Sequence, residues 1–543
     1  MSKPEVFVRS KSGLVRVMGT FDAFVLNVIV LSFFTGVIYS FQLVPTVLPG
    51  ANMGIAFLLT IVFTSCLYVS YAFMSSSYPR AGGDYVYQSR LIHPALAFVA
   101  TFSAWVVYQW FYNASFAVEA IWQSIQSLLG LYGWLYNSQG LVSAASWTVS
   151  PTGMLLVGGL ILLVSTICAM MKLSFIVKLQ LVFFALSCIG LLGVYGALLQ
   201  TTPQSFAANF NSMMAWSTGN STDWYSKIIS DASAAGYTPQ GFDWYQTLAA
   251  VPIAMIAMGY GFWSIYLAGE IKTARVTKLA LYAIYGCVIF MGIVFFLVYQ
   301  LLLNVGSLFY NSLFYLYMTG GAVISQIPIT PNYISVAMIA TSNPALIAII
   351  SIGTFANVFI LMVIMPIVGS RVMFAQAMDW ILPQKLAQVG KRFVAPVWAI
   401  WVYFVGSLIW FVADIYYPSV AFYFTAVVVG VLLAYLLTGV SAIVFPYRQK
   451  AAYESSPISK YKIGNIPASV IAGIGTLALC VYILWFYLTI PGLGLLPISI
   501  SNPSLDFVVG LYIILLVWYY GAKWYRARKG IDLNLSFKVV PPE

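Results

Sequence analysis

The stretch GYGFWSIYLAGEIK, residues 259–272, closes the sixth long apolar segment of the chain. Two glycines, Gly259 and Gly261, stand two apart in a segment apolar enough to cross a bilayer, and the apolar run stops at Glu270 and Lys272. Glycine inside a helix is less favourable than alanine by roughly 0.5–1 kcal/mol. The pair therefore predicts either a close contact between helices or a break in this one.

The composition of the whole chain places that stretch in a membrane protein. Of 543 residues, 61% are hydrophobic and only 7% are charged, and the mean hydropathy is +0.91. A soluble domain carries roughly 25% charged residues, so this much apolar surface must face lipid. We expect an all-α integral protein of a lipid bilayer. The five cysteines lie in apolar runs without metal-ligand spacing, which predicts no metal site.

A membrane-spanning helix needs about 20 apolar residues, and twelve segments qualify. When the N-terminus is placed inside, all but one of the 25 basic residues fall on the inner side, the exception being Lys227. The positive-inside rule then predicts a multi-pass protein of the cell membrane with both termini cytoplasmic. The net charge of +11 reflects a face next to anionic lipid and requires no nucleic acid. The predicted spans, numbered helix 1 to helix 12 in chain order, are 20–44, 52–75, 93–122, 152–170, 174–199, 245–268, 277–304, 342–370, 394–412, 419–445, 466–490 and 504–522.

Ionisable side chains are scarce within these spans. Of the 14 acidic residues, only Glu119 lies more than a turn inside a span, and Asp22 lies where the first span begins. An ionisable group within the membrane is a functional hypothesis by default. Glu119 is predicted to couple protons or contact a cation, or else to reach water at the outer end of helix 3. Asp22 is predicted to be a gate or a helix cap. In helix 3, Asn113 is a candidate for a substrate cavity or for a hydrogen bond between helices.

The motifs of several enzyme classes are absent from the sequence. No cluster of His, Cys and carboxylate residues and no phosphate-binding glycine loop occurs along the chain. Membrane-embedded metal or acid–base catalysis needs such clusters, and ATP-driven transport needs a nucleotide site. We therefore expect no enzyme activity, no catalytic residues, no metal and no cofactor. Any transport is expected to use an ion or solute gradient.

The first and sixth spans carry interruptions in matching places. The first, FVLNVIVLSFFTGVIYSFQLVP, holds Ser32, Thr35 and Gly36 at its middle, and the sixth holds Gly259 and Gly261. Because the two spans lie five apart, they cross in opposite directions, as an inverted five-plus-five repeat requires. Unwound helices expose backbone N–H groups that can bind a carboxylate near the midplane. Close helix packing at the glycines is the alternative.

Two stretches on the predicted inner side resemble signatures of the amino acid–polyamine–organocation permease superfamily, of the prokaryotic amino acid permease type. YPRAGGDYVYQSRLIHPALAF (78–98) resembles its Pro-x-x-Gly-Gly-x-Tyr-x-Tyr pattern. GSRVMFAQAMDWILPQKLAQVGKRFVAPVWA (369–399) resembles its Arg-x-x-x-Ala-x-x-x-Asp-x-x-x-Pro pattern. AGEIKTAR, after helix 6, and the ending GIDLNLSFKVVPPE also resemble segments of this family.

The resemblance implies a gradient-driven secondary transporter of amino acids or related amines, a symporter or antiporter that works by alternating access. It implies a first inverted repeat in 20–199, an extracellular loop in 200–244, a second repeat in 245–445 and two extra helices in 466–522. Segments 1–19 and 523–543 would be cytoplasmic. By position, the implied substrate-binding residues are Thr35, Gly36 and Val37 in helix 1, and Gly259, Tyr260, Gly261 and Trp263 in helix 6.

The solute class stays open at this point. Phe34 occupies the first of two glycine positions that are usual in the helix 1 turn of the superfamily. That departure keeps a permease for another small organic or inorganic solute as an alternative. A channel or sensor that does not transport is a further alternative.

The coupling ion also has several candidates. Ser187 stands where some relatives in the superfamily place a lysine in helix 5. Helix 8 offers Ser351, Thr354 and Asn357, which are spaced three apart and so lie roughly on one face. Their oxygens could hold sodium, and hydrogen bonds between helices are the alternative. Proton coupling through Glu119, sodium coupling through helix 8 and uncoupled exchange are all compatible with the sequence.

Overall fold

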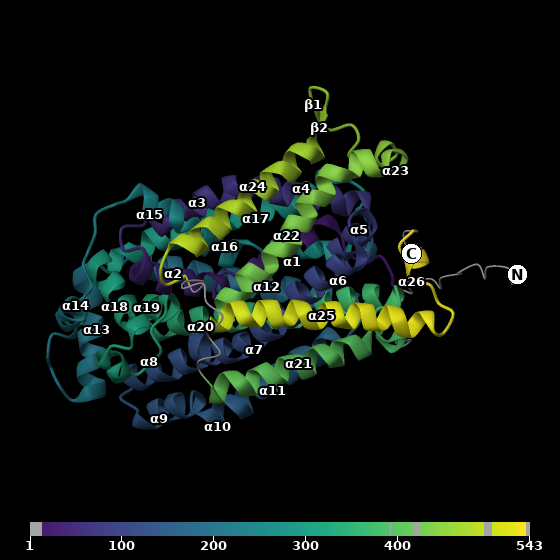
Figure 1. Ribbon diagram of the computed structural model, residues 1–543. Helices are drawn as coiled ribbons and strands as arrows, with labels where there is room; N and C mark the ends of the chain where they lie inside the picture. The colour runs from purple at the N-terminus through teal and green to yellow at the C-terminus, as the bar shows by residue number, and fades with distance from the viewer. Residues whose placement is uncertain (1–13, 391–392, 418–422, 494–501, 539–543) are drawn as a thin grey trace, which may run out of the picture.

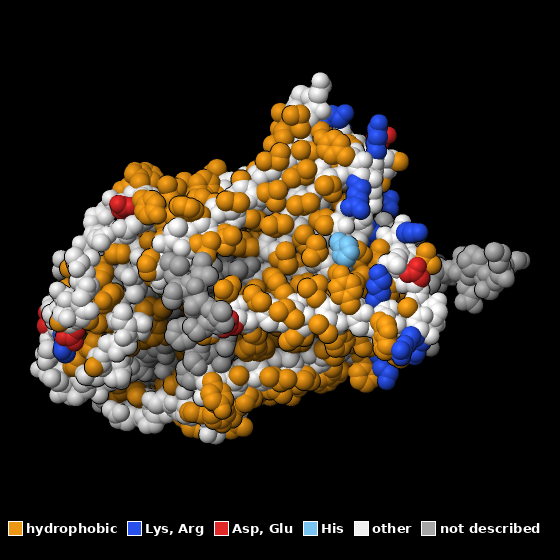
Figure 2. Space-filling model, viewed as in Figure 1, with side chains coloured by type: hydrophobic (Ala, Val, Ile, Leu, Met, Phe, Trp, Pro, Cys, Tyr) orange, Lys and Arg blue, Asp and Glu red, His pale blue; other side chains and the backbone are white. Residues whose placement is uncertain are grey.

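The computed structural model describes residues 14–390, 393–417, 423–493 and 502–538, which form a bundle of helices (Figure 1). Helices α5 (Asp84–Leu91), α23 (Lys450–Glu454) and α26 (Leu533–Ser536) lie at one end of the bundle, and α13 (Pro203–Thr218) and α14 (Trp224–Ala234) lie at the other. Figure 2 shows Lys and Arg side chains gathered at the end with α5, α23 and α26, beside a broad apolar band. We call this end the basic end.

The helices long and apolar enough to span a bilayer number up to twelve among the described residues, when one bent pair is counted as a single span. Each predicted span overlaps one of them, which confirms the all-α fold class. In order, they are Thr20–Val47, the bent pair α3 (Met53–Phe63) and α4 (Ser65–Ser77), Pro94–Leu135, Pro151–Ala169, α12 (Leu173–Leu199), Trp244–Tyr266, Thr277–Val305, α20 (Pro344–Met378), α21 (Val397–Tyr416), Gly430–Arg448 within α22 (Tyr423–Arg448), α24 (Ala468–Thr489) and α25 (Pro503–Ala527).

Both predicted interruptions are present. The first span divides into α1 (Thr20–Leu31) and α2 (Thr35–Val47). The sixth begins with α15 (Trp244–Ala249) and α16 (Val251–Met258), turns through 259–262 and continues only as two short 3₁₀ segments, η4 (Trp263–Tyr266) and η5 (Ala268–Glu270). The inner part of this span is therefore not an α-helix, which leaves its backbone carbonyls in need of other hydrogen-bond donors.

Several spans run further than predicted, and the third, eighth and ninth are those that bear on the site. The third extends to Leu135 through α6 (Pro94–Phe102), η1 (Ser103–Val107), α7 (Tyr108–Ala120), η2 (Ile121–Gln126) and α8 (Ser127–Leu135), and η1 and η2 are π-helical. Helix α20 continues to Met378 because its polar end finds partners inside the protein, among them Gln376, which donates to Thr101. Helix α21 continues to Tyr416. Residues 419–422, where the tenth span was predicted to begin, lie outside the described part of the chain.

Shorter elements fill the connections. The segment 200–244, predicted as a polar loop, contains α13 and α14. The segment between the seventh and eighth spans contains α18 (Ser307–Thr319), η7 (Ala322–Gln326) and α19 (Tyr333–Ile339). The connections also contain α9 (Gln139–Thr148), η8 (Gln384–Ala387) and the antiparallel pair β1 (Lys462–Ile463) and β2 (Ile466–Pro467). The fourth span consists of α10 (Pro151–Gly153), η3 (Met154–Gly158) and α11 (Gly159–Ala169), and the seventh consists of α17 (Thr277–Leu302) and η6 (Leu303–Val305).

Candidate functional site

A cavity of about 460 Å³ lies against both interrupted helices. This volume falls within the range of roughly 300–1,000 Å³ that is typical of small-molecule sites. The wall is built from the middle spans and from α18, and it mixes aromatic and polar groups. Its polar and amphipathic lining residues are Thr35, Tyr39, Gln42, Gln109, Tyr112, Ser115, Glu119, Trp122, Tyr260, Trp263, Tyr317 and Asp414.

The break in the first span is organised by Ser32. This residue has φ 53° and ψ 126°, a left-handed conformation that L-residues rarely adopt. Its Oγ accepts hydrogen bonds from the N–H groups of Phe34 (3.2 Å) and Thr35 (3.0 Å), and donates to Asn357 Oδ1 of α20 (2.5 Å). Phe34 itself has φ −117°. The turn therefore forms without a glycine at position 34, because Ser32 supplies the unusual backbone angle.

In the sixth span, side chains from other helices satisfy carbonyls that the break releases. Tyr435 Oη donates to the Gly259 carbonyl (2.6 Å), and Cys287 Sγ donates to the Gly261 carbonyl (3.2 Å). Buried backbone carbonyls without a donor are costly. These contacts therefore stabilise the unwound segment beside the cavity.

Four residues predicted to bind substrate do line the cavity: Thr35, Gly36, Tyr260 and Trp263. Thr35 and Trp263 are only 4% and 2% exposed, and within the described part of the chain neither Thr35 Oγ1 nor Trp263 Nε1 has a hydrogen-bond partner. A buried polar atom without a partner costs about 1–3 kcal/mol. The two atoms are thus available to a polar ligand at the helix breaks.

The other four predicted substrate-binding residues lie outside the lining of this cavity. The space where Gly261 would carry a Cβ is 3.0 Å from Cys287 Sγ, so this glycine permits close packing against α17. The Asn113 side chain instead donates to Ser407 Oγ of α21 (3.2 Å), which is the alternative hydrogen bond between helices. The four residues are Val37, Gly259, Gly261 and Asn113.

Glu119 lies in the cavity wall and accepts a hydrogen bond from Gln123 Nε2 (2.7 Å). A second carboxylate, Asp414, lines the same cavity. Asp414 lies two residues beyond the predicted end of the ninth span (394–412), and the longer α21 brings it into the cavity wall. Tyr317 and Met318 of α18 were also missed because hydropathy assigned no element there. A search of the segment 305–343 for apolar residues at helical spacing was the available way to predict a helix there.

The residues predicted to take part in coupling or gating are already engaged in hydrogen bonds. Asp22 Oδ2 accepts from the Gly19 N–H (2.8 Å) and so caps α1, while Asn357 faces Ser32 in the helix break. A sodium or proton pathway through these groups stays a prediction. The three hydroxyls donate to backbone carbonyls: Ser187 to Phe183 (2.7 Å), Ser351 to Ser124 (3.1 Å) and Thr354 to Ile350 (2.8 Å).

Two buried ion pairs lie at the basic end. Arg371 of α20 binds Glu270 through two parallel hydrogen bonds, Nε to Oε1 (2.9 Å) and Nη2 to Oε2 (3.1 Å). Arg90 of α5 pairs with Asp379 at 2.8 Å, and Tyr85 Oη also donates to Asp379 (2.8 Å). All four charged side chains are at most 2% exposed. These pairs join the three stretches 78–98, 259–272 and 369–399 that looked separate in the sequence.

The paired glycines of the first signature permit this junction. Gly82 has φ +100°, and a Cβ at that position would lie only 2.3 Å from the Cβ of Ala375. Its N–H donates to the Tyr266 carbonyl (3.2 Å). A larger residue at position 82 would push α20 away from the loop before α5. The glycine and the alanine of the two signatures therefore meet in space.

Asp84, which begins α5, is buried among neutral donors. Its Oδ2 accepts from Trp105 Nε1 (2.9 Å) and from Tyr71 Oη (3.4 Å). Burial raises the pKa of this carboxyl to about 7, because desolvation outweighs the hydrogen bonds that favour the charged form.

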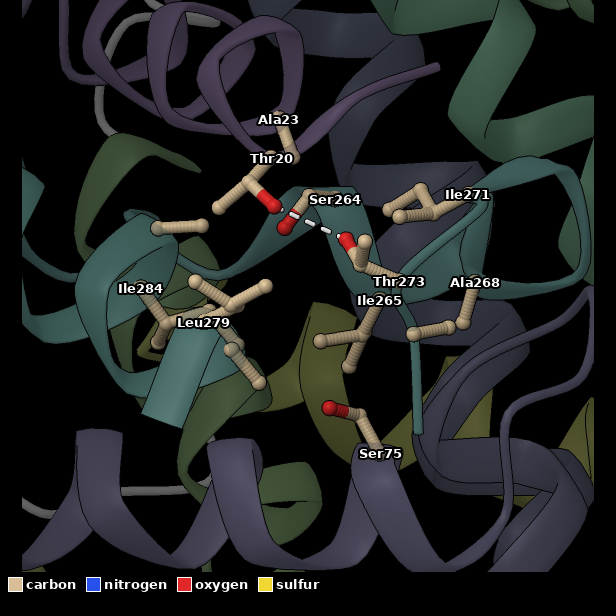
Figure 3. Close-up of a pocket in the computed structure, with 13 residues that line it drawn as sticks. Thr20, Ala23, Ser75, Ser264, Ile265, Ala268, Ile271, Thr273, Leu279 and Ile284 are labelled. Atoms are coloured by element: carbon tan, nitrogen blue, oxygen red, sulfur yellow. Dashed lines mark hydrogen bonds between the residues drawn. The ribbon is translucent and has the colours of Figure 1, made fainter. Parts of the chain in front are cut away.

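A second and much smaller cavity lies near the basic end, between the start of α1, the 3₁₀ segments of the sixth span and the start of α17. Figure 3 shows the Thr20 and Thr273 hydroxyls joined there by a hydrogen bond of 2.8 Å. Its volume of about 30 Å³ suits a water molecule and not an organic solute. The large cavity at the helix breaks is therefore the candidate site.

The family comparison agrees with this architecture. A family model described as "Amino acid permease" matches residues 19–519, from the first span to the last. The chain belongs to the amino acid permease family. No individual relative among curated proteins matches it. Membership makes this permease a multi-pass membrane transporter of amino acids or related solutes, and it confirms the superfamily resemblance of the two signatures.

Proposed function

We propose that the permease is a gradient-driven secondary transporter of amino acids or related amines that works by alternating access, with the basic end in the cytoplasm. One observation carries the proposal: the large cavity meets both broken helices and presents two buried polar atoms, Thr35 Oγ1 and Trp263 Nε1, that find no partner among the residues the structure describes. Half-helix ends at a cavity are the arrangement by which transporters bind charged solutes. No residue in this site performs catalysis in the proposal.

The two ends of the molecule support alternating access. The basic end is closed by the Arg371–Glu270 and Arg90–Asp379 pairs, while Met318 at the other end of the cavity is 36% exposed. In the proposal, this arrangement receives solute from outside the cell. Separation of the two pairs would then open the cytoplasmic side.

The test is uptake by purified protein in liposomes under imposed proton and sodium gradients, with a panel of labelled amino acids and amines. Gly36→Val should abolish uptake, because a Cβ there would lie 2.8 Å from the Leu31 carbonyl oxygen, at the helix break. Gly196→Val in α12 is the matched control, since a Cβ there meets nothing within 4 Å. Uptake by the Gly36 variant equal to that of the control would contradict a working helix break. The absence of any uptake, exchange or ligand-induced stabilisation in the unmodified protein would contradict the substrate class.

A further inference from the structure

The cavity continues from the helix breaks to a pair of carboxylates, Glu119 on α7 and Asp414 on α21. Two hydrogen bonds fix the register of these helices, Tyr403 Oη to the Gln109 carbonyl (3.0 Å) and Asn113 Nδ2 to Ser407 Oγ (3.2 Å). Both bonds join residues 294 apart in the sequence. The helices therefore run parallel and in step, and the same offset from residue 119 leads to residue 413. The two carboxylates consequently stand at the same level of the cavity.

No positive charge faces this pair among the described residues. The cavity lining contains no Lys, Arg or His, and neither Glu119 nor Asp414 forms an ion pair in the described part of the chain. Two carboxylates that are half-buried at the same level repel each other and lose hydration. A cation between them offsets both costs.

The surrounding wall indicates which cation fits. Tyr112 and Phe116 stack with ring centroids 5.9 Å apart, and Trp122 and Tyr317 also line the cavity. Aromatic faces attract organic ammonium and guanidinium groups, whereas Ca²⁺ takes six to eight oxygen ligands and Mg²⁺ six. The described residues hold no group of three or more His, Cys, Asp or Glu that could bind a metal. The chemistry therefore favours an organic cation.

The opposite end of the same cavity, at the helix breaks, favours a hydrogen-bond acceptor group on the solute. Trp263 Nε1 has no hydrogen-bond partner among the described residues, and the N–H group of Gly36 lies in the first turn of α2, where a helix offers it no acceptor. Donors of this kind at a helix N-terminus bind carboxylates. The Tyr112 and Tyr260 rings lie 6.1 Å apart, which places this end at the level of Tyr112. Glu119 is seven residues further along, or about 10 Å along the helix axis.

We propose that the transported solute is an amino acid with a positively charged side chain. Its carboxylate binds at the breaks of the first and sixth spans, and its side-chain cation binds between Glu119 and Asp414. The inference rests on the proposed function and specifies the solute of the same site. The lining residues supply a separate group for each end of an extended molecule.

The first experiment compares lysine and arginine with norleucine, a neutral analogue of similar length. Binding is measured by thermal stabilisation of the purified permease, and uptake is measured in liposomes. Lysine or arginine should stabilise the protein at concentrations at least about 10-fold lower than norleucine, since a charge-assisted hydrogen bond is stronger than a neutral one. Equal binding of norleucine and lysine overturns the inference while leaving amino acid transport intact. Failure of all amino acids overturns the proposed function itself.

The second experiment tests the carboxylates directly. Glu119→Gln and Asp414→Asn should each weaken the binding of lysine by about 10-fold or more and leave that of norleucine unchanged. The matched control is Asp506→Asn, which removes a carboxylate from the first turn of α25 outside the cavity lining. Unchanged lysine binding in both cavity variants overturns the inference.

Further probes test the other possible occupants of the pair. Putrescine carries ammonium groups but no carboxylate, and it should bind more weakly than lysine. Tighter binding of putrescine than of lysine overturns the assignment of the carboxylate end. Stabilisation by Na⁺ or Ca²⁺ alone that disappears in Glu119→Gln overturns the organic cation in favour of a metal ion.

Discussion

Buried carboxylates have opposite surroundings at the two ends of the permease. At the basic end, Arg371 and Glu270 share two hydrogen bonds and are at most 2% exposed. Away from the helix breaks, Glu119 and Asp414 line the same cavity, and its described lining contains no basic residue. Carboxylates within the same membrane protein are thus matched at one end and left without a cation at the other.

The difference separates a structural contact from a ligand site. A buried ion pair whose charges and hydrogen bonds are already satisfied holds segments together and offers a solute little additional binding energy. Carboxylates that have no cation beside them can still gain a favourable electrostatic interaction when a positively charged solute binds. Asp84 is an intermediate case, because it is fully buried but has only neutral donors.

The largest expected effect comes from breaking the matched end. Arg371→Met leaves the Glu270 charge buried without a partner, which should destabilise the folded protein by about 3–5 kcal/mol. The measurement is the apparent Tm and the yield of monodisperse protein in detergent. Arg275→Met removes an exposed arginine five residues from Glu270 and serves as the control. A loss no greater than that of the control would show that the pair does not stabilise the folded protein.

The intermediate case predicts a pH dependence. The pKa of Asp84 is raised to about 7 by burial, so between about pH 4 and pH 7 the folded protein keeps a proton that the unfolded chain has released. Stability should therefore fall as the pH rises through this window, by up to about 1.4 kcal/mol per pH unit, and the fall should stop above it. Asp84→Asn should lack this part of the slope. Apparent Tm values of both proteins from pH 4.5 to 7.5 give the comparison, and parallel curves would contradict the prediction.

Steric contact at the basic end gives a smaller effect. Gly82→Ala introduces a Cβ 2.3 Å from that of Ala375, at a backbone φ of +100°. The expected loss is about 1–3 kcal/mol from strain and overpacking. The double variant Gly82→Ala with Ala375→Gly should recover the part due to the clash and keep the part due to φ. No recovery in the apparent Tm would mean that the contact between Gly82 and Ala375 is not the cause of the lost stability.

The smallest effect is expected at an exposed ion pair. Lys227 and Asp231 on α14 lie 3.0 Å apart with side chains 37% and 33% exposed. Lys227→Met should change the free energy of unfolding by no more than about 1 kcal/mol. The measurement is the apparent Tm at low and high salt. A loss as large as that of Arg371→Met would remove the proposed distinction between buried and exposed pairs.

Much of the fold follows from local properties of the sequence. Apolar runs, prolines and the sorting of basic residues located all twelve spans, because the bilayer demands length and hydropathy from each helix separately. The glycines at 259 and 261 and the Ser-x-x-Thr-Gly segment at 32–36 marked both breaks, since a helix interruption is a short-range event. The two signatures led to the permease family on the same basis.

What each residue faces was decided only by the tertiary structure. Glu119 was visible as a charge within a span, but its position at the same level of the cavity as Asp414 depends on the register between α7 and α21. Gly261 and Asn113 lie on predicted helices yet pack against neighbours away from the cavity lining. The rotation of a helix about its axis is set by packing against segments that are distant in the chain. For that reason the sequence located the breaks, and the assembled bundle determined which side chains reach the cavity.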